Sequence, residues 1–515
     1  MKILGYISLT VLLPAFVVSC EYSLDEISED VNNPVQVHPR TILTTLCINT
    51  FGIEFYGIQP YRMAWQWDQR GGGGHFNLLR RNFISEYRRI AWCYDMCNEA
   101  DRVSDERYKY LAAYFRASWM FDITRMFGDV PFTEAGTGRF DENPNYYPKY
   151  DLQEDIIASL LNELETANKA LARYEGTSVS GDIIYGGDIH KWRKLINLYR
   201  LRILINCSMK ETIKGNSIRE MFAAIVGNPD ENPLMENLED SAIRDETGNS
   251  ENYNYYNDNN FVSSYRISKY VVDYMVDRHD MRLPKLAEVV MRLENSGVDI
   301  NDFSNYNGVI PNPGANSDNN NEDMDSGNQS KLNRRWYLEP QGPSAMNIGY
   351  PEQEFILAEA ALRGWIDADA EIHYKNGIRA ACEFLGVSSS DINEYLAQEQ
   401  VQFKGTDTEK LGKIITEKYL NFFMQGGNEA WFEIRRTGYP DFSEYLTRNI
   451  DNLYNDGYLP LRYQYPQSEI DNNNKNVVEA ISRLDKGDDR NSRMWLLIGS
   501  DPLFNPDPFP FRYEN

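Results

Sequence analysis

Residues 353–365 read QEFILAEAALRGW, and this stretch carries the clearest structural signal in the chain. Hydrophobic side chains recur in it at the three- and four-residue spacing of one helical face: Phe355, Ala358, Leu362 and Trp365. Ala360 and Ala361 leave room for a second helix to approach closely. Another helical pattern follows at 375–385 after a short gap, which is the spacing of a helical hairpin. The stretch therefore predicts a mainly α fold built from paired helices.

Helical patterns continue on both sides of this hairpin, at residues 108–127, 152–171, 191–209, 410–423 and 429–436. The helix at 108–127 is apolar nearly all round, which predicts that it is buried between neighbours. Asp151 and Glu154 have the spacing of a capping box at the start of the next helix. The paired helices resemble tetratricopeptide-like hairpins, although no clean repeat of about 34 residues is present.

Polar stretches at 247–260, 312–329 and 463–474 interrupt the helical pattern. They are rich in Asn, Asp, Gly or Pro and too polar to build a core, so they are predicted to be long inserted loops. No linker separates autonomous domains. Residues 41–515 are therefore predicted to form a single α-helical body.

The first twenty residues are typical of a secretory signal. A short positive start and an apolar run at 3–18 lead to Ser19 and Cys20, and this ending resembles the lipobox of bacterial lipoproteins. We expect residues 1–19 to be a signal peptide and Cys20 to carry the lipid that anchors the chain to a membrane. Residues 20–40, acidic and interrupted by Pro and Asn, then form a flexible tether. The alternative is an ordinary signal peptide with a cysteine beside its cleavage site.

The formal net charge of -25 argues against a nucleic-acid partner, because phosphates demand a basic surface. It also argues against peripheral binding to anionic lipid. Aromatic residues make up 13% of the chain, a composition that suits stacking on sugars or peptides and also suits a large helical core. Of the cysteines, Cys93 and Cys97 lie one helical turn apart; small buried thiols are favoured over half a zinc site or a disulfide.

Two aromatic stretches are candidate ligand sites. In the first, Trp65, Trp67, Asp68, Arg70 and His75 surround four consecutive glycines at 71–74, where the backbone is free to approach a ligand. The alternative is that Trp65 and Trp67 are core anchors beside a flexible loop. The second candidate is the tyrosine cluster of the central loop, Tyr253, Tyr255 and Tyr256. The acidic run at 318–325 lacks the spacing of a calcium loop, so a solvated loop is favoured there.

No catalytic or cofactor motif is present in the sequence. The histidines are scattered without metal-ligand spacing, and there is no nucleophile elbow, phosphate loop or dinucleotide fingerprint. A glycosidase needs only two carboxylates, but no pattern in the sequence indicates which two acidic residues would form such a pair. We therefore predict a protein that is not an enzyme and holds neither cofactor nor metal.

Several motifs in a consistent order resemble the SusD/RagB family. They are FGDVPF at 127–132, DIIY at 182–185 with KWRKL at 191–195 and LR at 201–202, DMRLP at 280–284, YPEQEFILAEA at 350–360 and EAWFEIRRTGYP at 429–440. DMRLP departs from the family's usual DPRLP only at its second position. Most of these motifs have structural interpretations: Gly128 and Pro131 end a helix, and Arg435 and Arg436 are expected to form ion pairs with Glu433 and Asp441 rather than to bind substrate.

The resemblance implies a surface lipoprotein of the outer membrane with a helical scaffold of tetratricopeptide-like hairpins and long inserted loops. Such a protein covers a SusC-like TonB-dependent transporter and delivers a glycan, glycopeptide or oligopeptide to it. Two other functions remain open at this stage. One is a secreted helical glycosidase or lyase, and the other is a scaffold lipoprotein that binds only a protein partner.

Overall fold

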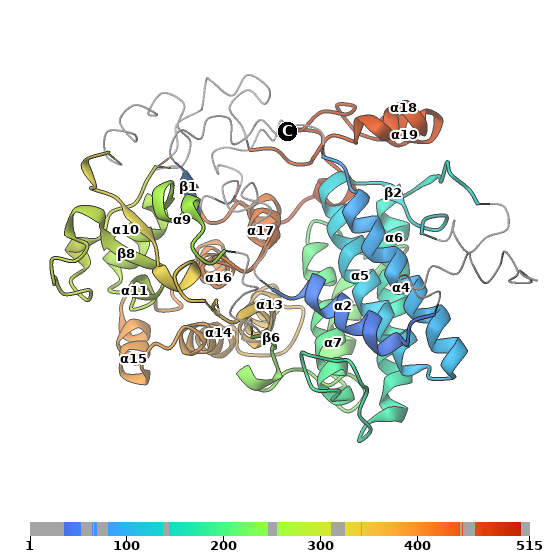
Figure 1. Cartoon of the computed structure of the whole chain (residues 1–515), viewed down its shortest axis with the longest axis horizontal. Coiled ribbons are helices and arrows are strands. Elements are labelled where there is room, and N and C mark those ends of the chain that lie inside the picture. The colour runs from blue at the N-terminus through green and yellow to red at the C-terminus, as the bar shows by residue number, and fades with distance from the viewer. Residues whose placement is uncertain are drawn as a thin grey trace, which may run out of the picture. The chain divides into compact units, whose positions relative to one another are not determined.

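Helices dominate the structure, as the sequence predicted (Figure 1). The computed structural model describes residues 36–52, 64, 66–69, 81–136, 144–245, 255–310, 325–340, 342–442, 445 and 459–505. The helices of the first half are α2 (Pro39–Thr50), α4 (Ile84–Val103), α5 (Arg107–Phe127), α6 (Gln153–Leu171), α7 (Ile189–Asn206) and α8 (Ile218–Val226). Those of the second half are α9 (Asn259–Ser263), α10 (Lys269–Asp277), α11 (Leu283–Leu286), α13 (Tyr350–Leu362), α14 (Ala370–Phe384), α15 (Ser389–Ala397), α16 (Asp407–Asn421), α17 (Glu429–Thr437), α18 (Gln467–Asn472) and α19 (Asn474–Ser482).

The long helices α4 to α7 pack consecutively, α4 on α5, α5 on α6 and α6 on α7. Helix α5 lies in the middle of this group and is buried on nearly every side, which confirms the prediction for residues 108–127. It ends where Gly128 takes a positive φ of 93°, a conformation that suits glycine. The chain then forms the short strand β2 (Val130–Pro131), so the FGDVPF motif is a helix stop.

Helices α13 and α14 form the hairpin predicted from residues 353–385, and α13 also packs against α16 and α7. The two helices approach closely where Gly377 of α14 faces Phe355 of α13. A Cβ placed on Gly377 would lie 2.7 Å from the Phe355 ring, so only glycine fits there. The hairpin therefore depends on a small residue, as its sequence suggested, although the glycine lies on the second helix.

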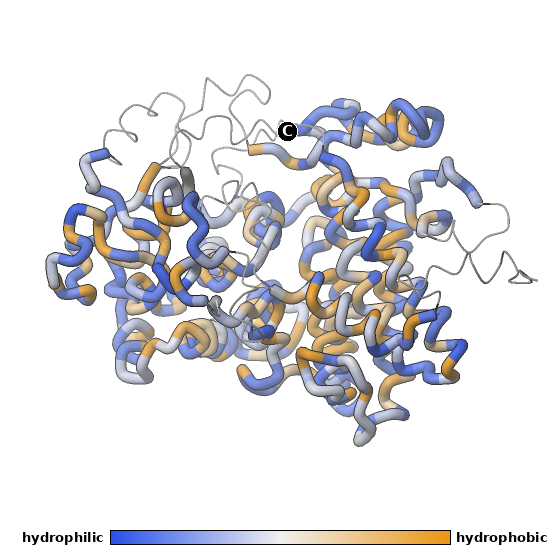
Figure 2. Tube along the Cα trace, in the orientation of Figure 1, coloured by the Kyte–Doolittle hydropathy of each residue, from blue (hydrophilic) through white to orange (hydrophobic). Residues whose placement is uncertain are grey.

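Hydrophobic and hydrophilic residues alternate along the helices, as expected of elements that bury one face (Figure 2). One large hydrophobic core runs through the α4–α7 group and into α13 and α17. A second, smaller core lies among α13, α14, α15 and α16. Helix α13 contributes residues to both cores, which explains why its sequence is apolar over so much of its surface.

The strands are short and form small antiparallel sheets. Strands β1 (Trp67–Gln69), β7 (Tyr265–Ile267), β9 (Ser330–Leu332) and β8 (Ala287–Val290) make one sheet in that order. Two-stranded ribbons pair β10 (Ala345–Ile348) with β6 (Ala242–Arg244), β2 with β3 (Tyr150–Asp151), and β4 (Thr212–Ile213) with β5 (Asn216–Ser217). Because these strands come from segments between the helices, they are insertions into a helical scaffold.

Two local predictions are wrong. Helix α6 has no capping box: its N-cap is Leu152, and the Asp151 carboxylate instead accepts hydrogen bonds from the backbone N–H groups of Phe132 and Thr133 at 3.0 and 2.8 Å. The Asp129 carboxylate accepts the first helical N–H, that of Gln153, at 2.8 Å. The stretch 463–474, predicted to be a loop, contains α18 and begins with the buried side chain of Tyr463.

Backbone contacts group Pro39–Asn515 as one compact unit, apart from Met1–His38. The expected signal peptide and Cys20 lie outside the described residues. Within the described part of the chain, no helix has the length and apolar character required to cross a bilayer.

Candidate functional site

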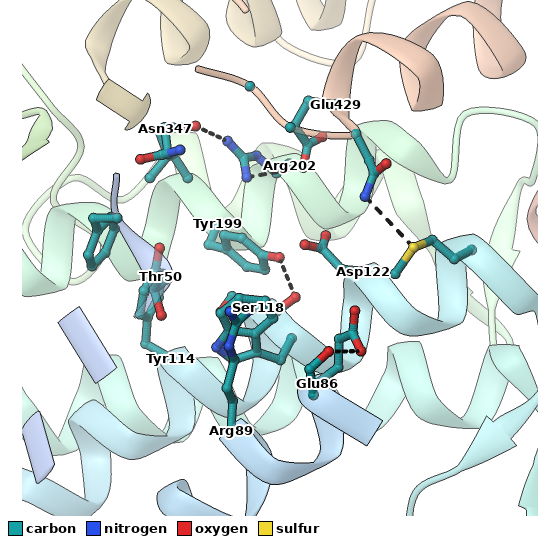
Figure 3. A pocket seen from close by; sticks show the side chains of 18 of the residues that line it. Thr50, Glu86, Arg89, Tyr114, Ser118, Asp122, Tyr199, Arg202, Asn347 and Glu429 are labelled. Carbon is teal, nitrogen blue, oxygen red and sulfur yellow. Dashed lines mark hydrogen bonds and ion pairs between the residues drawn. The ribbon is translucent and has the colours of Figure 1, made fainter. Parts of the chain in front are cut away.

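A pocket of about 390 Å³ lies among α2, α4, α5, α7, β10 and the start of α17 (Figure 3). We call it the interhelical pocket. Its walls combine aromatic rings with charged and amide side chains, drawn from segments far apart in the sequence. The residues used below are Glu86, Arg89, Ser118, Trp119, Asp122, Tyr199, Arg202, Asn347 and Glu429.

Asp122 of α5 is the most notable acid of the pocket, because a third of its side chain is exposed while its neighbours are buried. It forms an ion pair with Arg125 one turn along the helix. Burial raises the pKa of Asp122 to about 6, since it outweighs the attraction of Arg125 and acts together with the nearby Glu429 carboxylate. The pocket therefore contains a carboxyl group that accepts a proton more readily than an ordinary aspartate.

Glu429, at the start of α17, forms ion pairs with two arginines, Arg125 and Arg202. Its carboxylate accepts hydrogen bonds from Nη2 and Nη1 of Arg125 at 2.6 and 2.8 Å and lies 3.4 Å from Nη1 of Arg202. Burial alone would raise the pKa of Glu429, but Arg125 and Arg202 lower it to about 2. Glu429 is therefore a fixed anion, and it ties α17 to α5 and α7.

Arg202 of α7 closes this network on the other side. Its Nε donates to Glu352 of α13 at 2.7 Å, and a second guanidinium nitrogen pairs with the same carboxylate. It also donates to the backbone carbonyl of Asn347 at 3.3 Å, at the end of β10 (Figure 3). Four elements thus meet at one buried guanidinium, which makes this wall of the pocket rigid.

Aromatic side chains line the pocket as well. The guanidinium of Arg89 lies 4.1 Å from the centre of the Trp119 ring, a cation–π contact between α4 and α5. Tyr199 donates its hydroxyl hydrogen to the Ser118 carbonyl at 3.2 Å, which fixes that ring across the pocket (Figure 3). Glu86 pairs with Arg81 at 2.6 Å at the rim. Rings and hydrogen-bonding groups thus line the same space.

This arrangement suits binding of a polar, hydroxyl-rich molecule: carboxylates and amides accept and donate hydrogen bonds, and rings supply apolar contact. Among the described residues, no group of three or more His, Cys, Asp or Glu side chains is placed to hold a metal ion. The described cysteines are free thiols, and burial raises the pKa of Cys47, Cys93, Cys97, Cys207 and Cys382. Buried thiols of this kind are structural, as the sequence indicated.

A family model described as "Starch-binding associating with outer membrane" matches residues 72–466. The chain belongs to the SusD-like family. Proteins of this family are binding proteins rather than enzymes, and membership associates the chain with nutrient binding at the outer membrane. No curated protein matches the chain.

Solved structures of SusD-like proteins share the fold over nearly the whole chain. An outer-membrane protein of Bacteroides vulgatus, described as involved in nutrient binding, is 32% identical with a TM-score of 0.81. Two SusD homologues of Bacteroides fragilis are 31% and 28% identical, with TM-scores of 0.78 and 0.81. Each match covers 90% of this chain and 100% of the other chain.

Of the ligand residues predicted from the sequence, the described side chains of Trp67, Tyr255 and Tyr256 are not among those that line the interhelical pocket of this SusD-like protein. Trp67 lies in β1, is fully buried and packs against Tyr265 with ring centres 4.5 Å apart. Its ring has no exposed face for stacking in this conformation. Asp68 follows it in β1, opposite Arg266. Trp65, Arg70, His75 and the four glycines lie outside the described residues.

The two described tyrosines of the central cluster differ in exposure. Tyr255 is largely buried and contacts Phe261 with ring centres 6.1 Å apart. Tyr256, next in sequence, is 42% exposed. Of the two, only Tyr256 presents a substantial ring surface to solvent, so ligand contact there stays a prediction.

Sequence analysis missed Asp122 and Glu429. The signal for Asp122 was present, because an acidic residue within a helix that is apolar nearly all round must find a partner or a cavity. Glu429 belongs to the EAWFEIRRTGYP motif, and its partners lie on distant helices that no sequence spacing connects.

The ion pairs predicted for the arginines of this motif are confirmed in part. Arg436 pairs with Glu433 and, at 2.6 Å, with Glu359 of α13. Arg435 donates to the backbone carbonyl of Arg125 at 3.0 Å.

Proposed function

We propose that this SusD-like protein captures an oligosaccharide in the interhelical pocket and delivers it to a SusC-like TonB-dependent transporter in the outer membrane. The observation that carries the proposal is the partly exposed Asp122 carboxylate, which shares one cavity with the ring of Trp119. Family membership supports a nutrient ligand, and the family's starch-binding description favours a sugar over a peptide.

The chemistry of the pocket fits a sugar. Each sugar ring presents hydroxyl groups at its edge and C–H groups on its faces, so it needs acceptors and an apolar surface together. Asp122 supplies a charged acceptor, and a hydrogen bond to a charged group contributes roughly 1.5–3 kcal/mol. Trp119 lines the pocket and supplies apolar contact, although it is only 9% exposed and Arg89 lies over its ring. Glu429 and Arg202 are paired and buried, so they hold the wall in place, whereas Asp122, although paired with Arg125, keeps a third of its side chain exposed for a ligand.

The anchoring of the protein is part of the same proposal. Lipid on Cys20 would hold the chain at the membrane after removal of residues 1–19, and residues 20–40 would act as the tether. A lipid-anchored protein facing the outside would capture ligand before it reaches the transporter. The residues predicted from the sequence, Trp65, Trp67, Asp68, Arg70, Tyr255 and Tyr256, stay candidates for a second contact with longer oligosaccharides, and among their described rings that of Tyr256 is the exposed one.

The test is calorimetric titration of the purified protein with maltohexaose, other neutral oligosaccharides and oligopeptides. We expect one class of oligosaccharide to bind and Asp122→Asn to weaken that binding about tenfold. Asp101→Asn is the matched control, because Asp101 is an exposed carboxylate of neighbouring α4 that pairs with Lys109. Undiminished binding in Asp122→Asn would place the ligand elsewhere.

The same experiments distinguish the other functions. Release of shorter sugars during the titration would indicate a glycosidase or lyase. If no ligand binds detectably and an outer-membrane barrel co-purifies, the protein is a scaffold that binds only a protein partner. Co-purification of a TonB-dependent transporter together with sugar binding is the result expected for a capture protein.

A further inference from the structure

A second cavity, of about 500 Å³, lies on another side of α7, among α6, α7, α8 and the β4–β5 ribbon. We call it the α6–α8 pocket. One part of its lining is apolar and includes Leu161, Leu204, Met221 and Ile225. The rest is polar, and Arg200 of α7 is its most buried charged group at 7% exposure. A guanidinium and an apolar wall thus border the same cavity.

Arg200 is held in one orientation by buried amides. Its Nη1 donates to the side-chain oxygens of Asn197 and Asn232 at 3.0 and 2.8 Å. Asn232 and Asn197 are in turn hydrogen-bonded to Asn168 of α6 at 3.2 Å. A guanidinium fixed in this way loses little conformational entropy when it binds a ligand, so it is preorganised for recognition.

The charge of Arg200 is incompletely compensated. Among the described residues, the carboxylate paired with it is that of Glu165, 3.5 Å from Nη2, and Glu165 is 42% exposed and also pairs with Lys169. Nη2 donates no hydrogen bond to any described residue, and Nε, which is buried, has no partner there either. Burial lowers the pKa of Arg200, and Glu165 only partly offsets this effect. Neutral amides and one partly exposed acid, which Arg200 shares with Lys169, therefore leave a buried cation that a second carboxylate would stabilise.

We propose that the α6–α8 pocket is a second ligand site, which binds an organic carboxylate through the Nη2 edge of Arg200 and packs the body of the ligand against the apolar wall. Arginine matches carboxylate geometry with parallel hydrogen bonds, which favours this anion. A carboxylate of this kind could belong to the end of a peptide or to an acidic sugar. The site is independent of sugar capture in the interhelical pocket, which the Asp122→Asn titration tests separately.

Ligand-observed NMR titration of the full-length protein tests the proposal with paired probes. N-acetyl-leucine is compared with N-acetyl-leucinamide, and D-glucuronate with D-glucose, so that each pair differs at the carboxylate. We expect at least one acid to bind and its neutral counterpart to bind at least about tenfold more weakly. Binding of the leucine acid indicates a peptide terminus, and binding of glucuronate indicates an acidic glycan. Equal binding of acid and neutral probes, or binding of neither acid, would overturn the proposal.

Variants then assign the binding to Arg200. Arg200→Gln is expected to weaken acid binding about tenfold or more, whereas Arg219→Gln, an exposed arginine of α8 outside the pocket lining, leaves it unchanged. Glu165→Gln removes the competing carboxylate and is expected to strengthen binding several-fold. Ala224→Trp, at an exposed position of the lining, fills the cavity and is expected to abolish binding, which keeps the test decisive if Arg200→Gln does not fold. Acid binding that survives in both Arg200→Gln and Ala224→Trp would contradict the assignment.

Discussion

Arg200 and Arg202 lie two residues apart on α7, yet their surroundings are opposite. Residues two apart on a helix face different directions, so the two guanidiniums reach different neighbours. Arg202 pairs with Glu352 and Glu429, and those carboxylates raise its pKa well above the ordinary value although burial alone would lower it. Arg200 meets neutral amides and one partly exposed acid, Glu165, which also pairs with Lys169, and burial lowers the pKa of Arg200. The same side chain is therefore a structural clamp on one face and an incompletely neutralised cation on the other.

The comparison shows why charged residues in family motifs are poor guides to a ligand site. Arg202, Glu352, Glu359, Glu429 and Arg436 all lie in the motif segments and are all paired across helices. Burying a charge is costly unless a partner and hydrogen bonds compensate it, so these residues hold α7, α13 and α17 together. Asp122 and Arg200, which lie outside the quoted motif residues, are the groups with capacity left for a ligand.

The largest expected effect is the loss of protein stability when the buried ion pairs of Arg202 with Glu352 and Glu429 are broken. Arg202→Met leaves Glu352 buried and removes one of the two cations beside Glu429, so we expect it to lower the free energy of unfolding by about 3–5 kcal/mol. Arg200→Met should cost only about 1–2 kcal/mol, because it removes hydrogen bonds to neutral amides. Urea unfolding of both variants measures the difference. Equal losses would remove the distinction between the two faces of α7.

The double variant Arg202→Met/Glu352→Met provides the control. Replacing both members of a buried pair by apolar residues leaves no uncompensated charge between them, so much of the lost stability should return. A double variant as unstable as Arg202→Met would indicate that packing, rather than the unpaired charge, causes the loss.

The second effect concerns pH. The pKa of Glu429 is lowered from 4.5 to about 2, so its ion pairs stabilise the protein above pH 4.5 and lose this contribution as the pH falls toward 2. Near neutral pH, Glu429→Gln should reduce the free energy of unfolding by about 3 kcal/mol, and the difference from the parent should shrink toward zero at about pH 2. Glu399→Gln, at an exposed turn position two residues beyond the end of α15, is the control and should show no such convergence.

Asp122 should behave in the opposite way. Because its pKa is raised to about 6, the folded protein takes up a proton there as the pH falls from about 6 to 4, and this uptake stabilises the fold. Asp122→Asn mimics the protonated form. We expect it to raise the free energy of unfolding by about 1 kcal/mol at pH 7.5 and to have little effect at pH 4. A loss of stability at pH 7.5 would show that Asp122 is needed for the clamp.

The smallest effect is expected at the acid beside Arg200. Glu165 is 42% exposed and lies 3.5 Å from Nη2, so Glu165→Gln should change the free energy of unfolding by less than about 0.5 kcal/mol. Glu352→Gln, the matching change beside Arg202, should cost several times as much. Thermal and urea unfolding of the two variants compare the acids directly. A large loss in Glu165→Gln would mean that Arg200 is better neutralised than its geometry indicates.

Local patterns predicted the helices well. The periodicity of residues 353–365 and the apolar run at 108–127 specified which elements form, because a helix is built from contacts three and four residues apart. The motifs in their order also identified the family. The same local reasoning was wrong at α6, where Asp151 has the right spacing for a cap but accepts hydrogen bonds from the backbone of Phe132 and Thr133, beside the β2–β3 ribbon. It was also wrong at α18, where a polar stretch is helical.

The candidate sites could not be predicted in this way. Trp67 and Tyr255 were chosen for their residue type, and both are buried, because aromatic rings fill cores as readily as they bind ligands. The interhelical pocket combines α2, α4, α5, α7, β10 and α17, segments that the sequence does not connect. Nothing in the sequence distinguishes the partners of Arg200 from those of Arg202.

The sequence alone therefore established the helical class, the acidic surface and the SusD-like motifs, since these depend on composition and on neighbours along the chain. Only the tertiary structure decided which charged side chains are paired and buried. Whether a guanidinium or carboxylate is paired depends on which distant helices bring an opposite charge within about 4 Å, and how strongly it is paired depends on how much water remains beside the two charges. On α7, this pairing makes Arg202 a residue that holds helices together, whereas Arg200 on another face keeps capacity for a ligand.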